Sequence, residues 1–239
     1  MKKIVCDSPF LAAQAAADVF EEQIKAKSNS VLGLATGSTP IELYNELASR
    51  CSQGRFDFSQ AQTFNLDEYY PMKADNAQSY RSFMNKHLFS KVNFANSRVL
   101  NGEVSDPHAE CAKFDSEIEA VGGIDLQLLG IGHNGHIGFC EPSTSYTLDT
   151  YLVDLTDDTI EANSRFFGEG ETQPNQALTM GVGTIFKARK ILLLITGESK
   201  ADITKKLFDG VLYTDVPACL LLLHPDVTVV LDKAAAKHL

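Results

Sequence analysis

Residues 124–142 read IDLQLLGIGHNGHIGFCEP, and they say more about the fold than any other stretch of the chain. The first eight residues are a mostly apolar run of strand length, which predicts a buried strand. Four glycines then fall between positions 130 and 138. Glycines at this density disfavour helix and strand, and they allow tight turns and close approach to another molecule. The stretch therefore predicts a buried strand that ends in a Gly-rich loop.

Two side chains of this loop can take part in proton transfer. His136 carries an imidazole, a group able to move protons near neutral pH, and Glu141 can orient it or balance its charge. The alternative is a Gly-rich turn that merely contains a hydrogen-bonded histidine. His133, His136 and Glu141 also suggest metal ligands, but their spacing fits none of the strong zinc motifs, so we expect no metal.

Composition narrows the class of protein. The chain has 239 residues, 44% hydrophobic and 22% charged, as in an ordinary globular domain. Its net charge of −10, without a basic run, argues against a nucleic-acid partner. No apolar stretch is long enough to span a bilayer, and the N-terminal residues predict a first strand and no signal peptide. Five scattered cysteines without a C-x-x-C pair indicate reduced thiols, so we expect a cytoplasmic protein with no membrane partner.

Helical and strand patterns alternate from end to end. We expect helices over 10–25, 40–48, 79–88, 108–121 and 199–208, and strands near the N-terminus and over 31–35, 61–66, 126–131, 191–195, 220–223 and 227–231. This alternation predicts one α/β domain over residues 1–239, with a mostly parallel sheet flanked by helices. Residues 149–176 break the pattern, being long, polar and irregular, which suggests a lid or binding loop or else a plain surface excursion.

The loop at 36–40 follows the strand over 31–35 and precedes a helix. Its Ser38 and Thr39 hydroxyls and the N–H groups of the helix start could hold a phosphate. Pro40 suits the first helical position, and Thr39 with Glu42 matches a capping box, so the hydroxyls could equally serve only as caps.

Two further loops follow predicted strands. Asp67 lies at the end of the strand over 61–66, where burial would raise its pKa towards the range of a working base, although a solvated turn is the alternative. Lys200 falls in the first turn of the helix over 199–208, where a bound anion would offset the unfavourable helix dipole. The alternative is that Lys200 forms a salt bridge to Glu198. Since ligands bind outside the carboxyl ends of parallel strands, we expect these loops to form one acid/base site for a phosphorylated small molecule.

At this point the chain resembles a known family, the short form of glucosamine-6-phosphate deaminase (the isomerising glucosamine/galactosamine-6-phosphate isomerases). The resemblance runs in order from about position 31 to 232 and rests on LATGSTP (34–40), FNLDEY (64–69), GHNGHIGFCEP (132–142), NSRFF (163–167), ALTMGVGT (177–184) and GESK (197–200). It implies a Rossmann-like fold and the conversion of D-glucosamine 6-phosphate into D-fructose 6-phosphate and ammonia, with no cofactor.

The resemblance also implies roles for individual residues. His136, oriented by Glu141 with help from Asn134, would open the sugar ring, and Asp67 would move a proton between C2 and C1. The phosphate would be held by Thr36, Gly37, Ser38, Arg165 and Lys200. The chain departs from the family pattern at Asn134, often an aspartate, and at Cys140, commonly an asparagine. These changes leave the basicity of His136 more dependent on Glu141 and could alter hydrogen bonding in the loop.

Because longer relatives carry extra C-terminal residues used in hexamer assembly and allosteric control, we expect a monomer or small homo-oligomer without that control. Two alternatives remain open. A 6-phosphogluconolactonase shares the fold type and a similar Gly-rich loop with a histidine, but it needs no base for a C2-to-C1 proton shift. A non-enzymatic sugar-phosphate sensor would need neither His136 nor Asp67.

Overall fold

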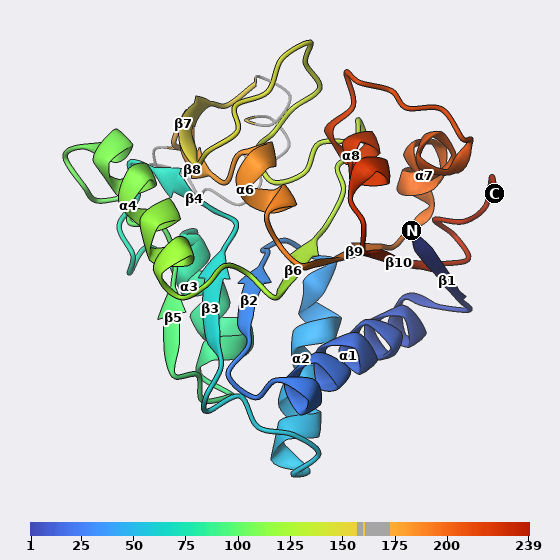
Figure 1. Cartoon of the computed structure of the whole chain (residues 1–239), viewed down its shortest axis with the longest axis horizontal. Helices are drawn as coiled ribbons and strands as arrows, with labels where there is room; N and C mark the ends of the chain where they lie inside the picture. The colour runs from blue at the N-terminus through green and yellow to red at the C-terminus, as the bar shows by residue number, and fades with distance from the viewer. Residues whose placement is uncertain (157–159, 161–172) are drawn as a thin grey trace.

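A computed structural model describes residues 1–156, 160 and 173–239 of the chain (Figure 1). Its centre is a seven-stranded, all-parallel sheet in the order β1-β10-β9-β6-β2-β3-β5. The strands are β1 (Lys2–Cys6), β2 (Val31–Leu34), β3 (Gln62–Asn65), β5 (Asn96–Arg98), β6 (Leu126–Leu129), β9 (Lys190–Ile195) and β10 (Val227–Asp232). The central strands β2 and β6 are buried along their whole length, as in a sheet covered on both faces.

Helices cover this sheet on both sides. In Figure 1, α1 (Pro9–Ala26) and α2 (Pro40–Ser52) lie on one side of β9 and β10, and α6 (Val182–Phe186), α7 (Ala201–Phe208) and α8 (Pro217–Leu220) lie on the other. The remaining helices of the described residues are α3 (Tyr80–Met84) and α4 (Pro107–Ala120), with the π-helix η1 (Asn85–Phe89) and the 3-10 turns η2 (Glu198–Lys200) and η3 (Leu221–Leu223). The expected α/β architecture with a mostly parallel sheet is confirmed.

A second, three-stranded antiparallel sheet was not expected from the sequence. Its order is β4-β8-β7, formed by β4 (Asp67–Tyr70), β8 (Gln176–Thr179) and β7 (Tyr151–Asp154). Leu66 connects the two sheets, because its N–H donates to Leu34 O at 2.8 Å and its carbonyl accepts from Met180 N at 2.9 Å. The chain thus passes from β3 directly into β4 through one residue.

Several expected boundaries change. The run at 220–223 is wrong as a strand: Pro217 begins α8, and η3 continues it, because the sheet position beside β9 belongs to β10. Leu221 is buried whereas Leu223 is 66% exposed, so the run does not have the two buried faces of an inner strand. The helix over 79–88 divides into α3 and η1, and α2 continues to Ser52.

Residues 149–176 are more regular than expected where the structure describes them. Tyr151–Asp154 form β7, and β8 begins at Gln176, so both ends of this segment belong to the second sheet. Its middle, including Arg165 and the NSRFF motif, lies outside the described residues. The idea that the segment acts as a lid stays a prediction.

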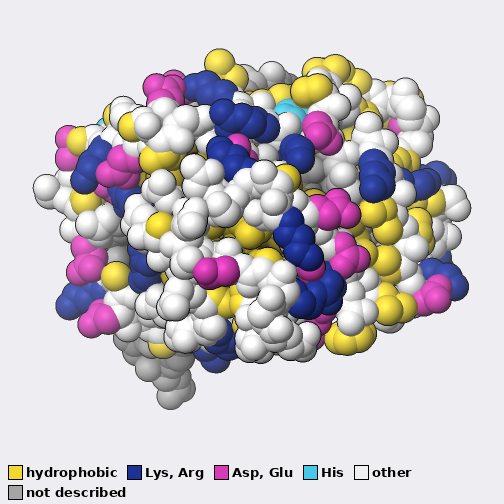
Figure 2. Space-filling model, turned by 60° about the horizontal axis from the view of Figure 1, so that its bottom comes forward, with side chains coloured by type: hydrophobic (Ala, Val, Ile, Leu, Met, Phe, Trp, Pro, Cys, Tyr) yellow, Lys and Arg dark blue, Asp and Glu magenta, His cyan; other side chains and the backbone are white. Residues whose placement is uncertain are grey.

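The surface carries both signs of charge. On the face drawn in Figure 2, acidic and basic side chains are scattered with hydrophobic side chains between them. Within the described part of the chain, no helix has the length and apolar character needed to cross a bilayer.

Substitution of Gly102 tests whether close backbone packing supports the second sheet. A Cβ at this position would lie 2.5 Å from Tyr69 O and 2.7 Å from Met72 O, and backbone atoms cannot move aside cheaply. We expect Gly102→Ala to lower the free energy of unfolding by about 1–3 kcal/mol in urea titrations. Gly130→Ala is the control, since a Cβ at Gly130 meets nothing within 4 Å. Equal stability of the two variants would contradict this account.

Candidate active site

The loops that follow β2, β3, β6 and β9 meet around one cavity of about 600 Å³. The cavity lies where the strand order changes direction, between β2 and β6, as ligand sites do in open parallel sheets. Eight of the nine residues expected at the site line it: Thr36, Gly37, Ser38, Asp67, Asn134, His136, Glu141 and Lys200. The ninth, Arg165, lies outside the described residues.

His136 lies against the backbone of its own loop. A Cβ at Gly132 would come within 2.3 Å of the imidazole, so only glycine lets the ring occupy this place. Gly132 N donates to His136 O at 2.9 Å, which closes the loop. The ring is therefore positioned by backbone geometry as well as by its side-chain neighbours.

Glu141 and Asn134 complete a small polar network around the histidine. His136 Nδ1 lies 3.4 Å from Glu141 Oε1, within ion-pair range but not aligned as a hydrogen bond. Asn134 Nδ2 donates to Glu141 Oε2 at 2.8 Å, and Asn134 Oδ1 accepts from His136 N at 3.1 Å. The amide thus holds the carboxylate on one side and the histidine backbone on the other. A long contact such as that between His136 Nδ1 and Glu141 Oε1 commonly shortens when substrate binds.

Asp67 is a strongly perturbed carboxyl of the cavity. It is the first residue of β4, not part of a turn, and it is 6% exposed. Burial raises its pKa to about 8, and the negative charge of Glu68 adds to the rise. Its Oδ1 has no hydrogen-bond partner among the described residues. A carboxyl with these properties can exchange a proton near neutral pH.

The loop at 36–39 and Lys200 lie in the same cavity. Thr39 has helical backbone angles and caps nothing with its side chain, so the expected capping box is wrong, while Pro40 does begin α2. Lys200 ends η2 and precedes α7, and burial lowers the pKa of its ammonium. Glu198 pairs with Lys237, so it does not neutralise Lys200. A cation and polar groups are thus available together for an anionic group.

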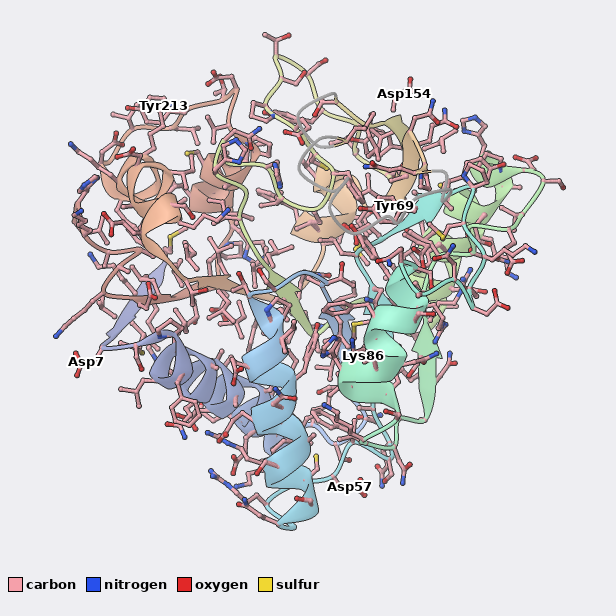
Figure 3. All side chains as sticks on the ribbon, turned by 180° about the vertical axis from the view of Figure 1, so that it is seen from behind. Asp7, Asp57, Tyr69, Lys86, Asp154 and Tyr213 are labelled. Carbon is pink, nitrogen blue, oxygen red and sulfur yellow. The ribbon has the colours of Figure 1, made fainter. Side chains whose placement is uncertain are left out.

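One wall of the cavity was not predicted from the sequence. Tyr80, Phe83, Lys86 and His87 from α3 and η1 line it, and Lys86 is labelled on this helix in Figure 3, where the helix runs beside α2. Lys86 and His87 belong to the π-helix η1, and π-helices are frequent at functional sites. The helical pattern over 79–88 was the only sign of this wall in the sequence, and it does not by itself indicate a site.

Aromatic rings lie next to Asp67. Tyr69 and Tyr80 have ring centroids 4.8 Å apart, and Tyr80 stacks with Phe139 at 6.2 Å. They belong to a small apolar cluster with Leu155 and Val153 from the segment over 149–176. Tyr69, Tyr80 and Phe139 line the same cavity as Asp67, so they give that part of its wall an aromatic character.

Cys140 and His133 have more modest places. Cys140 is buried, its thiol donates to Met180 O at 3.4 Å, and burial raises its pKa to about 11, so the thiol stays protonated. His133 lines the cavity with an exposed side chain. Among the described residues, no group of three or more His, Cys, Asp or Glu side chains is arranged to hold a metal ion.

Comparison with known proteins connects this geometry to one family. The model of the glucosamine-6-phosphate isomerases/6-phosphogluconolactonase family matches residues 9–230. Glucosamine-6-phosphate deaminase of Thermoanaerobacter pseudethanolicus is 49% identical over 238 residues, which cover 99% of this chain and 94% of that protein. The enzyme of the same name from Clostridium perfringens is 45% identical over 241 residues and matches over the whole of both chains.

Solved structures agree on the fold. A protein described as a monomeric glucosamine-6-phosphate deaminase superposes with a TM-score of 0.95 at 41% identity, covering 100% of both chains. The 6-phosphogluconolactonase of Trypanosoma brucei superposes with a TM-score of 0.79 at 18% identity, covering 100% of this chain and 98% of that one. At such low identity the second similarity concerns the fold alone.

The raised pKa of Asp67 has a consequence for stability. Between about pH 4 and pH 8 the folded protein holds a proton on Asp67 that the unfolded chain releases, so the wild type loses stability as pH rises through this window. Asp67→Asn removes this titration. In urea unfolding, we expect the stability of the variant relative to the wild type to rise by up to about 5 kcal/mol as the pH increases from 4 to 8. A stability difference that is independent of pH would contradict the assignment.

Proposed function

The chain belongs to the glucosamine-6-phosphate isomerase/6-phosphogluconolactonase family, and we propose that it is an isomerising glucosamine-6-phosphate deaminase. It converts D-glucosamine 6-phosphate and water into D-fructose 6-phosphate and ammonia. The observation that carries this proposal is the placement of Asp67 and the His136–Glu141 pair on one cavity, with Lys200 at the same cavity. A carboxyl base and a separate imidazole suit two successive proton transfers on one sugar.

Ring opening is the first step, and His136 performs it. The neutral imidazole takes the proton of the anomeric hydroxyl and delivers a proton to the ring oxygen, which breaks the C1–O5 bond and leaves an open-chain aldehyde. Glu141, 3.4 Å from Nδ1, stabilises the imidazolium formed in between. Asn134 keeps Glu141 in place through its 2.8 Å hydrogen bond. The neutral amide does so without adding charge.

Isomerisation and loss of nitrogen follow. Asp67 takes the proton from C2 of the aldehyde, which gives the enolate form of an enolamine, and then returns this proton to C1 while a proton passes from the nitrogen to O1. The product is an imine at C2, which water hydrolyses to a ketone and ammonia. Burial serves this step, because it raises the proton affinity of Asp67 to the range needed for both removal and return of a proton near neutral pH.

The phosphate group lies between the loop over 36–38 and Lys200. Thr36 and Ser38 offer hydroxyls, Gly37 offers its backbone, and Lys200 offers a partly desolvated positive charge. Such a cation binds an anion more strongly than one in open water does. Arg165, outside the described residues, would complete the phosphate site as the family resemblance implies.

We further propose a monomer located in the cytoplasm. The similar solved structure described as monomeric supports the first point. All five cysteines are free, as expected in a reducing compartment, which supports the second.

The function is tested by incubating the purified protein with glucosamine 6-phosphate and measuring ammonia. We expect release with no added metal and unchanged release in EDTA. We expect Asp67→Asn to lower kcat by at least about 100-fold, because it removes the base. His136→Gln should slow turnover of the ring form far more than of an open-chain substrate.

Hydrolysis of 6-phosphogluconolactone is the matched contrast for the same preparations. Lactone hydrolysis without ammonia release would show that the protein is a lactonase and not a deaminase. Full activity of Asp67→Asn would show that another group is the base.

Lys200 provides a separate test of the phosphate site. Lys200→Met keeps the length of the side chain and removes the charge. We expect the KM for the sugar phosphate to rise about 10- to 100-fold, with a parallel rise in the inhibition constant of inorganic phosphate. Lys237→Met, which removes an exposed lysine paired with Glu198, serves as the control and should leave both constants unchanged. Equal constants for the two variants would remove Lys200 from the site.

A further inference from the structure

Glu68 is a buried carboxylate beside Asp67 that the steps above do not use. It is 2% exposed. Its Oε1 accepts from Tyr69 N at 2.9 Å and from Tyr80 N at 2.8 Å, and its Oε2 accepts from Arg81 N at 3.0 Å. Three backbone N–H groups thus converge on one side chain. A buried acid with such partners is held in one orientation.

The position of Glu68 on β4 explains its reach. Successive side chains of a strand point to opposite faces, so Asp67 and Tyr69 face the cavity while Glu68 faces away from it. Its carboxylate meets the backbone N–H groups of Tyr80 and Arg81, the first two residues of α3. The N–H groups at the start of a helix have no partner within the helix, and here the Glu68 carboxylate supplies it.

The helix fixed in this way is itself a wall of the cavity. Tyr80 and Phe83 of α3 and Lys86 and His87 of η1 line the cavity. Because Glu68 and Asp67 are adjacent on β4, one short strand connects the proposed base to the wall that faces the substrate. A shift of α3 away from β4 would change the space beside Asp67.

We propose that Glu68 is a positioning residue for the reaction: its carboxylate fixes the first turn of α3 against β4, and its charge acts on the neighbouring Asp67. This inference rests on the proposed function, which gives Asp67 its part in the chemistry. It adds a residue that acts through two others and does not touch the substrate.

The charge of Glu68 has a defined direction of effect. Glu68 ionises before Asp67, because it accepts three N–H groups and faces the Arg81 guanidinium, whereas Asp67 Oδ1 has no described partner. Burial raises the pKa of Glu68 to about 7, and its negative charge then adds to the rise in the pKa of Asp67. The two carboxyls titrate as a coupled pair.

Among the described groups that act on this pair, Arg81 is a cation and the others are tyrosines and a thiol. Arg81 and Tyr80 face the two carboxyls from α3, and Tyr44 faces them from α2. Tyr69 of β4 and Cys140 of the loop after β6 face them as well. Arg98 on β5 acts on Arg81. β8, which pairs with β4, has the sequence QALT and brings neither acid nor base. Arg81 is itself fixed by a 3.0 Å hydrogen bond from Nη2 to Ser97 O.

Two variants separate the two effects of Glu68. Glu68→Gln keeps the length of the side chain and loses the charge, so the acidic limb of the kcat/KM profile, set by Asp67, should move to lower pH by about one unit. Glu68→Asp keeps the charge and withdraws from α3 by one methylene, so the limb should stay in place while KM rises about tenfold. Each variant thus retains what the other loses. Glu103→Gln is the control, since Glu103 is an exposed acid that accepts from Ala74 N and should change neither value.

The wild-type protein gives a second measurement that needs no variant to fold and no turnover. Carboxyl ¹³C NMR titration should show Glu68 losing its proton at lower pH than Asp67. The reverse order would overturn the inference, as would a Glu68→Gln profile and KM that both equal those of Glu103→Gln. If the wild type released no ammonia, the proposed function would fail, and the NMR order would still decide the relation between the two carboxyls.

Discussion

The backbone of Leu66 belongs to both sheets, and the site depends on this shared residue. Its N–H bonds to the end of β2, and its carbonyl bonds to the chain just after β8. Asp67 follows at once, so the residue that leaves the large sheet delivers a carboxyl to the small one. Backbone hydrogen bonds on both sides allow little movement of this point. The carboxyl is therefore placed by the main chain and only secondarily by side-chain packing.

The parallel sheet supplies the second constraint. All seven strands run the same way, so the loops after β2, β3, β6 and β9 emerge at one edge. Because the chain turns in opposite directions from β2 and β6, their loops separate and leave a crevice between them. Phosphate-binding groups enter from β2 and β9, and the imidazole enters from β6. Pieces of the site that are more than a hundred residues apart in sequence thus meet without any long connection.

The sequence predicted six of the seven strands of the large sheet, missing the short edge strand β5, and none of the strands of the small sheet. Strands such as Val31–Leu34 and Lys190–Ile195 are short apolar runs between turn signals, which local reasoning detects. β4 begins with two acids, and its burial depends on pairing with β8, more than a hundred residues later. No local pattern reports such a partner. The run at 220–223 failed for a related reason, since an apolar tetrad fits strand or helix and tertiary context decides.

The candidate site shows the same division. Glycines, a histidine and acids at strand ends predicted the loops that line the cavity, because those residue types are unusual at such places. The wall formed by α3 and η1 was missed because its pattern is that of an ordinary amphipathic helix. The support that Glu68 gives to α3 was missed too, since three converging N–H groups leave no mark on the sequence.

The amide of Asn134 also affects how a substrate reaches the site. An aspartate there would put a second carboxylate 2.8 Å from Glu141 Oε2, and both would repel an approaching phosphate dianion. With the amide, the lining of the cavity carries one negative charge fewer on a chain whose net charge is already −10. Long-range repulsion slows diffusional encounter, and dissolved salt screens it. The encounter rate of this protein with its substrate is therefore less sensitive to ionic strength than that of a counterpart with aspartate at this position.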